Sequence, residues 1–155
     1  MRDELLEAWR TNNRINLFLI DKISVAGMKC SLSKRGGRDV ARQFAHMHNV
    51  RVWHLEKRAR DLAEGLEEFE TKVTPTKTQL RKALSASGKA VESFLEGVIA
   101  GDPKRSGFKK GIFATLGYFV AHESHHRGNI LLTLKECGHN IDKAAQYAIW
   151  AWDQM

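Results

Sequence analysis

Two histidines one helical turn apart mark the segment best suited to chemistry. They belong to a string inside a long apolar run, His122-Glu123-Ser124-His125-His126-Arg127-Gly128. Residues four apart share a face of a helix, so His122 and His126 can chelate one metal ion. The same string satisfies H-E-x-x-H, in which two histidines bind zinc and the glutamate is the general base of a peptidase. The string alone therefore supports two different kinds of protein.

The apolar pattern upstream predicts where these histidines point. A stripe of apolar residues at helical spacing would face the interior of a bundle, namely Ile112, Leu116 and Phe119. His122 and His126 continue that stripe, and apolar residues resume at Ile130. Burying an imidazole without a partner costs about 1–3 kcal/mol. A shared ion would satisfy both rings, so we favour metal binding over two core histidines hydrogen-bonded to backbone or water.

A third ligand has to come from elsewhere in the chain. The segment before residue 60 offers His46, His48 and His54. His46 and His48 are two residues apart and face apart, so both are not expected at one ion. Helical periodicity favours His46 or His54 over His48 and does not decide between the first two. Three histidines with an open fourth position are typical of a catalytic metal site, and imidazole suits zinc, nickel, iron and copper.

The neighbours of the histidine pair have weaker claims on a metal. Glu123 points about 100° away from His122 on an ideal helix, which predicts a place on the helix surface or a role in supporting a ligand. His125 flanks the pair and is the lesser ligand candidate. Arg127 could bind an anion, but we expect its charge to reach solvent along the helix surface.

The peptidase interpretation needs a third ligand downstream of the pair. Neither Glu136 nor Asp153 stands at a persuasive spacing, and no strand that could hold a substrate backbone is predicted. The H-E-x-x-H peptidase is therefore the less favoured interpretation.

Five helical segments are expected to position these residues. Apolar periodicity predicts them at about residues 5–19, 40–62, 76–99, 112–134 and 142–152, separated by loops rich in glycine. Thr76 and Gln79 form a capping-box pattern, and Gly138 is placed to end a helix. The fold class predicted is all-α: residues 1–155 form a single-domain four-helix bundle with a short C-terminal fifth helix. Trp150 and Trp152 in that last helix are expected to pack on their own bundle, with a dimer face as the alternative.

Composition excludes several classes of protein. The 155 residues carry a net charge of +7, but the basic residues are spread along the chain without a recognition motif, so no nucleic acid partner is expected. No apolar run approaches the roughly 20 residues that span a membrane. The acidic, amphipathic N-terminus does not resemble a signal peptide, which predicts a cytoplasmic protein. Cys30 and Cys137 are expected to remain reduced thiols.

Three stretches of the chain resemble the DinB/YfiT-like superfamily of metal-binding four-helix proteins. They are Arg42-Gln43-Phe44-Ala45-His46-Met47-His48-Asn49-Val50-Arg51, His122-Glu123-Ser124-His125-His126-Arg127-Gly128-Asn129-Ile130 and Tyr147-Ala148-Ile149-Trp150-Ala151-Trp152. The resemblance implies a metal site with one histidine from the second helix and two from the fourth, which by position are His46, His122 and His126. This chain has Asn129 where the family usually has glutamine. The resemblance also implies a homodimer, and some relatives are transferases that use low-molecular-weight thiols.

The sequence thus predicts a protein that binds a divalent metal ion, Zn, Ni or Fe. The expected function is a metal-dependent transferase or hydrolase, with a small-molecule thiol or another small substrate as its partner. The alternative is a metal-binding or interaction bundle without enzymatic activity.

Overall fold

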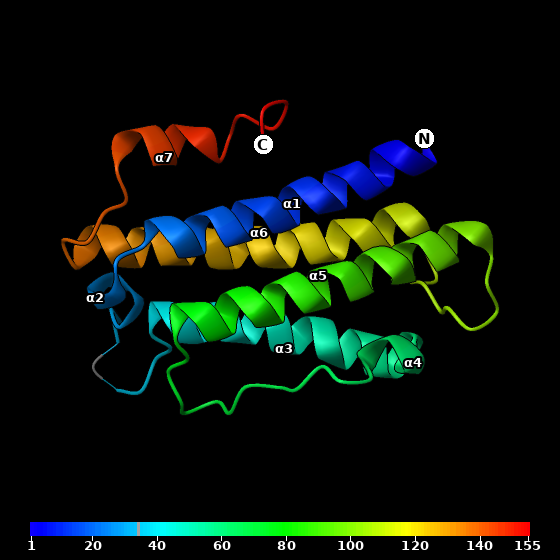
Figure 1. Ribbon diagram of the computed structural model, residues 1–155, viewed down its shortest axis with the longest axis horizontal. Helices are drawn as coiled ribbons and strands as arrows, with labels where there is room; N and C mark the ends of the chain where they lie inside the picture. Colours follow the sequence, from blue (N-terminus) through cyan, green and yellow to red (C-terminus); the bar gives the residue numbers. More distant parts are fainter. Residues whose placement is uncertain (34) are drawn as a thin grey trace.

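Four long helices form the body of the protein (Figure 1). The computed structural model describes residues 1–33 and 35–155. The long helices are α1 (Arg2–Lys22), α3 (Val40–Arg58), α5 (Lys77–Ala100) and α6 (Ile112–Glu136), and the short ones are α2 (Val25–Met28), α4 (Arg60–Ala63) and α7 (Lys143–Ala148). No strand occurs in these two ranges. The predicted all-α bundle with a short C-terminal helix is confirmed, and the one-turn helices α2 and α4 were not predicted.

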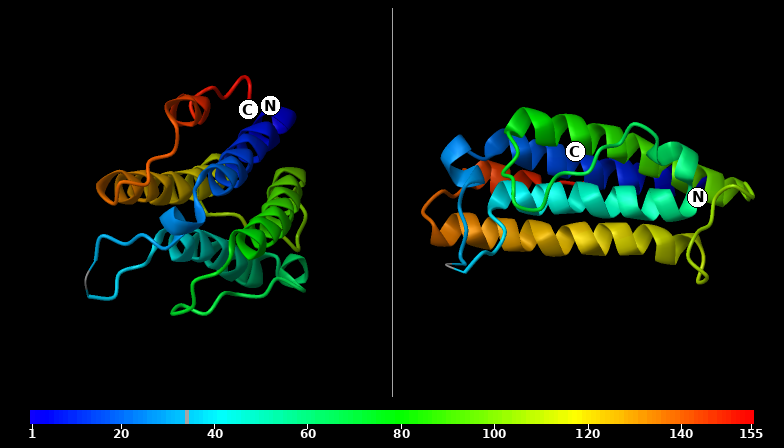
Figure 2. Two further views of the ribbon diagram at one scale, coloured as in Figure 1. Left: turned by 60° about the vertical axis from the view of Figure 1, so that its left-hand side comes forward. Right: turned by 90° about the horizontal axis from the view of Figure 1, so that it is seen from below.

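Each long helix packs against two or three of the others. Helices α1 and α3 both contact α5 and α6, and α5 also contacts α6. The left-hand view in Figure 2, which looks obliquely along the bundle, shows the four long helices around a common interior, with α7 outside them near α1. The contact between α3 and α6 matters most for function because the two histidine-bearing segments lie on these helices.

Local side-chain and backbone chemistry sets the helix ends. The Asp39 carboxylate accepts the Arg42 amide at 2.7 Å and caps α3. The predicted capping box is confirmed: the Thr76 hydroxyl accepts the Gln79 amide, and the Gln79 side chain accepts the Thr76 amide. Gly138 adopts the left-handed region with φ 74° directly after Cys137, the C-cap of α6, as expected for a helix-ending residue.

The second predicted helix is shorter than its apolar pattern suggested. The pattern continues to Leu62, but α3 ends at Arg58 because Ala59 leaves the helical region with φ −162° and ψ 57°. The chain then forms the separate turn α4. Apolar spacing is insensitive to a single non-helical residue, so the pattern could not reveal this break.

The interior consists of two apolar clusters with a polar layer between them. One cluster gathers around Phe44, Met47 and Ile130, and the other around Trp9, Phe94 and Phe119. Between them along the helices lie polar side chains that are almost fully buried: Asn12, Asn16, Arg51, Ser87, Glu123 and Arg127. A buried polar layer is stable only when its members satisfy one another by hydrogen bonds.

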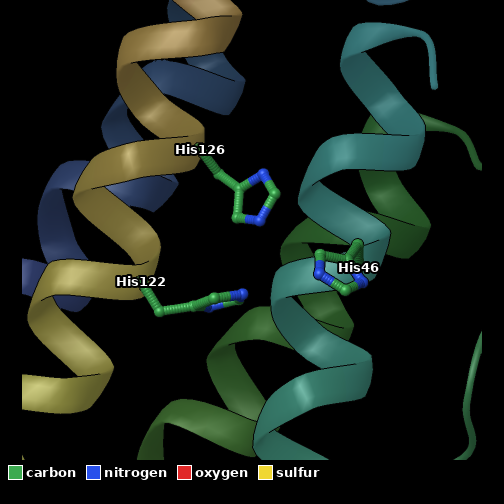
Figure 3. A group of neighbouring side chains, drawn as sticks. All are labelled: His46, His122 and His126. Carbon is green, nitrogen blue, oxygen red and sulfur yellow. The ribbon is translucent and has the colours of Figure 1, made fainter. Parts of the chain in front are cut away.

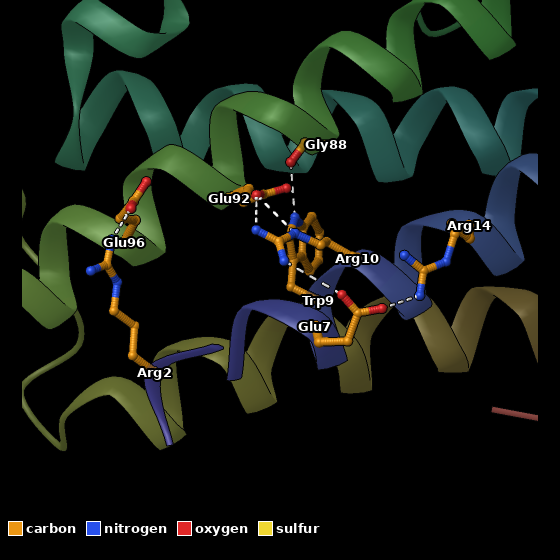
Figure 4. A network of polar contacts seen from close by, with 8 residues as sticks. All are labelled: Arg2, Glu7, Trp9, Arg10, Arg14, Gly88, Glu92 and Glu96. Atoms are coloured by element: carbon orange, nitrogen blue, oxygen red, sulfur yellow. Dashed lines mark hydrogen bonds and ion pairs between the residues drawn. The ribbon is translucent and has the colours of Figure 1, made fainter. Parts of the chain in front are cut away.

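Helices α1 and α5 are joined by polar contacts along one edge (Figure 4). The Trp9 indole donates to the Gly88 carbonyl at 2.8 Å, and Arg10 donates through Nε and Nη2 to Glu92 Oε1 at 2.9 and 2.7 Å. Gly88 has little room for a side chain, because an added Cβ would lie 2.4 Å from the Asn13 amide. The absence of a side chain at this position therefore permits the close approach of α1.

The C-terminal segment packs through fewer aromatic residues than expected. Ala145 and Ile149 are buried, whereas Trp150 is 77% exposed and Trp152 is 40% exposed. The prediction that both tryptophans pack on their own bundle is thus wrong for Trp150, since the smaller apolar residues of this segment make the buried contacts. Within residues 1–33 and 35–155, no helix is long and apolar enough to cross a membrane.

Candidate metal site

Three imidazoles from two helices meet at the contact between α3 and α6 (Figure 3). His46 of α3 faces His122 and His126 of α6, and all three rings point toward one another. One nitrogen from each ring lies within 4.8 Å of the other two. Ring centroids are 5.3 Å apart for His46 and His122, 4.8 Å for His46 and His126, and 4.7 Å for the α6 pair. The structure thus brings together the three histidines that the family resemblance implied.

The spacing of these nitrogens suits a metal ion. Imidazole nitrogens on a tetrahedral zinc ion lie about 3.4 Å apart, given Zn–N bonds of about 2.0–2.1 Å. Small side-chain rotations would bring the three rings to that separation. Moreover, Nδ1 of His126 is buried, and no group in the described ranges donates or accepts a hydrogen bond there. Since an unsatisfied buried polar atom is costly, an ion bound at this nitrogen would remove that cost.

The surroundings of the cluster favour neutral imidazoles. Burial, followed by the positive charge of Arg38, lowers the pKa of His46 to about 4. Burial and the neighbouring His122 and His46 lower the pKa of His126 to about 3. The pKa of His122 is also lowered, mainly by burial. Neutral imidazole is the form that binds metals, so the ligands are ready at neutral pH without losing protons.

The sequence predicted that the histidine pair continues the apolar core stripe, and this prediction is wrong. From Phe119, an ideal helix places Glu123 about 40° around the axis and His122 about 60° in the other direction. Glu123 is fully buried, whereas His122 and His126 are only partly buried and turn toward α3. The apolar stripe is therefore continued by charged residues, and the histidines flank it.

Glu123 forms the centre of the buried polar layer. Its Oε1 accepts Arg51 Nε at 2.6 Å, and its Oε2 accepts Arg51 Nη2 at 2.9 Å. Amides of Asn12 and Asn16 each donate to Oε2 at 2.7 Å. The prediction that Glu123 lies on the helix surface is wrong. Its pKa is lowered because the two arginine charges and these hydrogen bonds outweigh the burial that would raise it.

This environment removes the main argument for a peptidase. A general base needs a carboxylate oxygen free to take a proton from water beside the metal. Both oxygens of Glu123 are instead held by Arg51 and two asparagines at zero exposure. The H-E-x-x-H pattern is therefore a coincidence of a histidine pair that faces α3 and a glutamate that faces the interior.

Arg127 is also buried, contrary to the expectation that its charge reaches solvent. It donates to Asn16 Oδ1 at 2.8 Å and to Ser124 Oγ at 2.7 Å, and it is 7% exposed. Burial lowers its pKa, and the nearby Glu123 opposes that effect. Sequence reasoning missed the partners Arg51, Asn12 and Asn16, although asparagines within the apolar face of a helix were an available signal.

The remaining histidines of these helices lie outside the cluster. His48 is buried and its Nε2 is 2.9 Å from the Glu67 carbonyl. His54 packs against aromatic rings, with its centroid 4.7 Å from Tyr118. His125 is exposed and contacts Asn129 Nδ2 at 3.1 Å. Of the three histidines that the sequence offered on this helix, His46 is the one that lies beside His122 and His126.

Two cavities flank the histidine cluster. The larger is about 350 Å³ and is lined by His126, His125, Asn129, Gln43 and Arg38, together with Thr133, Leu132 and residues 31–33. The smaller is about 30 Å³ and lies on the His46 side, where Trp53, Phe69 and Arg38 line it. The larger cavity has room for a small molecule next to the cluster.

Comparisons with known proteins address the whole chain. The sequence model of the DinB family matches residues 1–151. Comparisons with curated proteins and with solved structures gave no significant match.

Proposed function

The chain belongs to the DinB family, and from this premise we propose that His46, His122 and His126 bind one divalent metal ion that serves a transferase or hydrolase reaction. The convergence of three neutral imidazoles beside a cavity is the observation that carries the proposal. Three histidine ligands leave a fourth position for a substrate or water, as in catalytic rather than structural zinc sites. The donor set suits zinc, nickel or iron.

The ion would supply Lewis-acid chemistry, since it lowers the pKa of a bound water or thiol and so produces a nucleophile at neutral pH. The protein's own residues provide the remaining requirements. His46 and the α6 pair stay uncharged and are held on two packed helices, so their nitrogens would be available to hold the ion. The neighbouring cavity would orient the electrophile. A low-molecular-weight thiol is the nucleophile we propose for the transferase reaction.

Metal analysis of protein purified without a histidine tag tests the site. We expect one equivalent of metal in the wild type and its loss in His46→Ala, His122→Ala and His126→Ala. The matched control is His125→Ala, because His125 lies on the same helix but is exposed and outside the cluster. Full metal content in the three ligand variants would refute the proposed site.

Activity assays separate the functional classes. Conjugation of a thiol to an electrophile would support the transferase, and hydrolysis of small esters would support the hydrolase. Casein cleavage would instead support the peptidase, which Glu123 argues against. If the metal-loaded protein turns over none of these substrates, the alternative of a metal-binding protein without enzymatic activity gains support.

We also propose that the protein is a homodimer. Helix α7 and the residues around it expose large apolar side chains, with Tyr147 at 67% and Leu132 at 51% exposure beside Trp150. Exposed aromatic residues are enriched at protein interfaces. Sedimentation equilibrium of the wild type and of Trp150→Ser would test the proposal, since a monomeric wild type would refute it.

A further inference from the structure

Arg38 lies where the two cavities beside the histidine cluster meet. It is an exposed residue directly before the α3 cap Asp39, and it lines both the larger and the smaller cavity. The backbone at this point is well anchored: the Val40 amide donates to the Cys30 carbonyl at 3.0 Å, and Asp39 accepts the Thr74 hydroxyl. Arg38 therefore presents a positive charge from a fixed backbone position.

The guanidinium of Arg38 has no partner among residues 1–33 and 35–155, where no hydrogen bond or ion pair involves it. Arg42 offers a contrast one turn along the chain. It also lines the smaller cavity, but its Nε donates to the Thr71 carbonyl at 2.7 Å. Arg38 thus keeps its planar set of donors available, and such a set matches the oxygens of a carboxylate or phosphate.

A second polar group lines the larger cavity. Gln43 is 7% exposed, lines this cavity, and its side chain makes no hydrogen bond within the part of the chain that the structure describes. Neither polar atom of this amide is sealed from solvent, so the amide opens into the cavity. A ligand in the cavity would find it free to form hydrogen bonds.

Arg38 lies next to the histidine cluster. It lines the larger cavity together with His126 and the smaller cavity together with His46. An anion bound by Arg38 would therefore lie close to the proposed metal ion.

We propose that Arg38 and Gln43 form a subsite that binds the anionic group, a carboxylate or a phosphate, of a small substrate whose reacting end lies at the histidine cluster. This inference rests on the proposed function for the reacting end. The anion subsite itself depends only on Arg38, Gln43 and the cavity. Arg38 supplies the charge and Gln43 supplies an amide donor, while the cavity has room for a small molecule.

Binding of simple anions can be followed residue by residue in ¹⁵N-labelled protein by NMR. The probes are propionate, inorganic phosphate and the neutral isostere propionamide, each titrated into metal-free and zinc-loaded samples of known metal content. We expect saturable shifts around residues 31–38 and 125–129 with an anion and none with propionamide. The propionate and phosphate arms show which of the two groups the subsite prefers.

Substitutions then assign the effect to Arg38. Loss of one charge-assisted contact predicts about tenfold weaker anion binding in Arg38→Gln. In Arg38→Lys, which keeps the charge and loses the planar fork, the loss should be smaller. The matched control is Arg35→Gln, because Arg35 is exposed in the same loop and lines neither cavity. The spectra also report whether each variant is folded.

The outcomes separate this inference from the proposed function. Anion binding that is equal in wild type and Arg38→Gln, or that maps elsewhere, refutes the subsite even if zinc binds. Absence of zinc binding refutes the proposed function, and the metal-free titration still decides the subsite. An anion that shifts the spectra only with zinc and independently of Arg38 would show binding to the metal alone, which also refutes the subsite.

Discussion

Replacing Glu123 with glutamine should destabilise the protein strongly although it changes a single atom. The carboxylate accepts four hydrogen bonds at zero exposure, two of them from Arg51. Every group around it is a donor, so the new amide NH₂ meets a donor in either orientation. The substitution also leaves the buried charges of Arg51 and Arg127 without a counter-charge.

Breaking a buried ion pair by removing one partner costs about 3–5 kcal/mol. A domain of this size is stabilised by about 5–15 kcal/mol in total, so the loss is a large fraction. With a slope of about 2 kcal/mol per molar urea, the unfolding midpoint should fall by about 2 M. Urea unfolding of the metal-free protein, followed by circular dichroism at 222 nm, measures this shift.

Glu92→Gln is the matched control on the surface. Glu92 accepts Arg10 Nε and Nη2 at 2.9 and 2.7 Å, and its side chain is 29% exposed (Figure 4). A pair of this kind contributes about 0–1 kcal/mol because solvent screens it. Equal losses for Glu123→Gln and Glu92→Gln, or a loss below about 1 kcal/mol at Glu123, would refute the structural role assigned to the buried carboxylate.

Three further predictions concern pH and the helix ends. In the folded protein the pKa values of His46 and His126 are lowered from 6.5 to about 4 and about 3. Between pH 6.5 and these lower values, the unfolded chain therefore binds more protons than the folded protein. The metal-free protein should therefore lose stability as pH falls below 6.5. In melting curves recorded from about pH 7 to about pH 4, a double variant with glutamine at both positions should lose less stability than the wild type. Melting temperatures that fall equally with pH in the two proteins would contradict this. Thr76→Ala should cost about 1 kcal/mol by removing the capping box of α5, whereas Thr78→Ala in the exposed first turn should not destabilise, as urea unfolding of both would show. Gly101→Ala should lower the melting temperature by about 2–4 °C, because φ is 72° at this position and an alanine there is strained. No atom lies within 4 Å of the new Cβ, so backbone strain is the only cost expected. An unchanged melting temperature would contradict this prediction.

Much of the fold could be predicted because its signals are local. Helical periodicity, the Thr76–Gln79 capping box and Gly138 after α6 each involve residues within one or two turns. The break at Ala59 was missed since neighbouring apolar residues on both sides keep the same spacing. Local rules thus predicted which segments are helical but not every end.

The rotation of α6 about its axis was predicted less well. The sequence placed the histidines on the core stripe, and the step of about 100° from His122 then placed Glu123 on the helix surface or in support of a ligand. Glu123 is instead buried with partners that are distant in the chain, since Arg51 is 72 residues away and Asn12 is 111 residues away. No local pattern reports such a contact, so the orientation of α6 could only be read from the packed structure.

In the string 122–128, the burial of two charged residues determines where the two histidines point. His122 and His126 each precede a buried charged residue, Glu123 and Arg127 respectively, by one position. One position corresponds to about 100° around a helix. When Glu123 and Arg127 are held in the core, the direction of the histidine pair is therefore fixed as well. The hydrogen bonds from α1 and α3 to Glu123, and from Arg127 to Asn16 of α1, hold that face inward, and the histidines must then face α3 and His46. The glutamate that suggested a peptidase base therefore contributes to the histidine cluster by orienting the helix that carries two of its members.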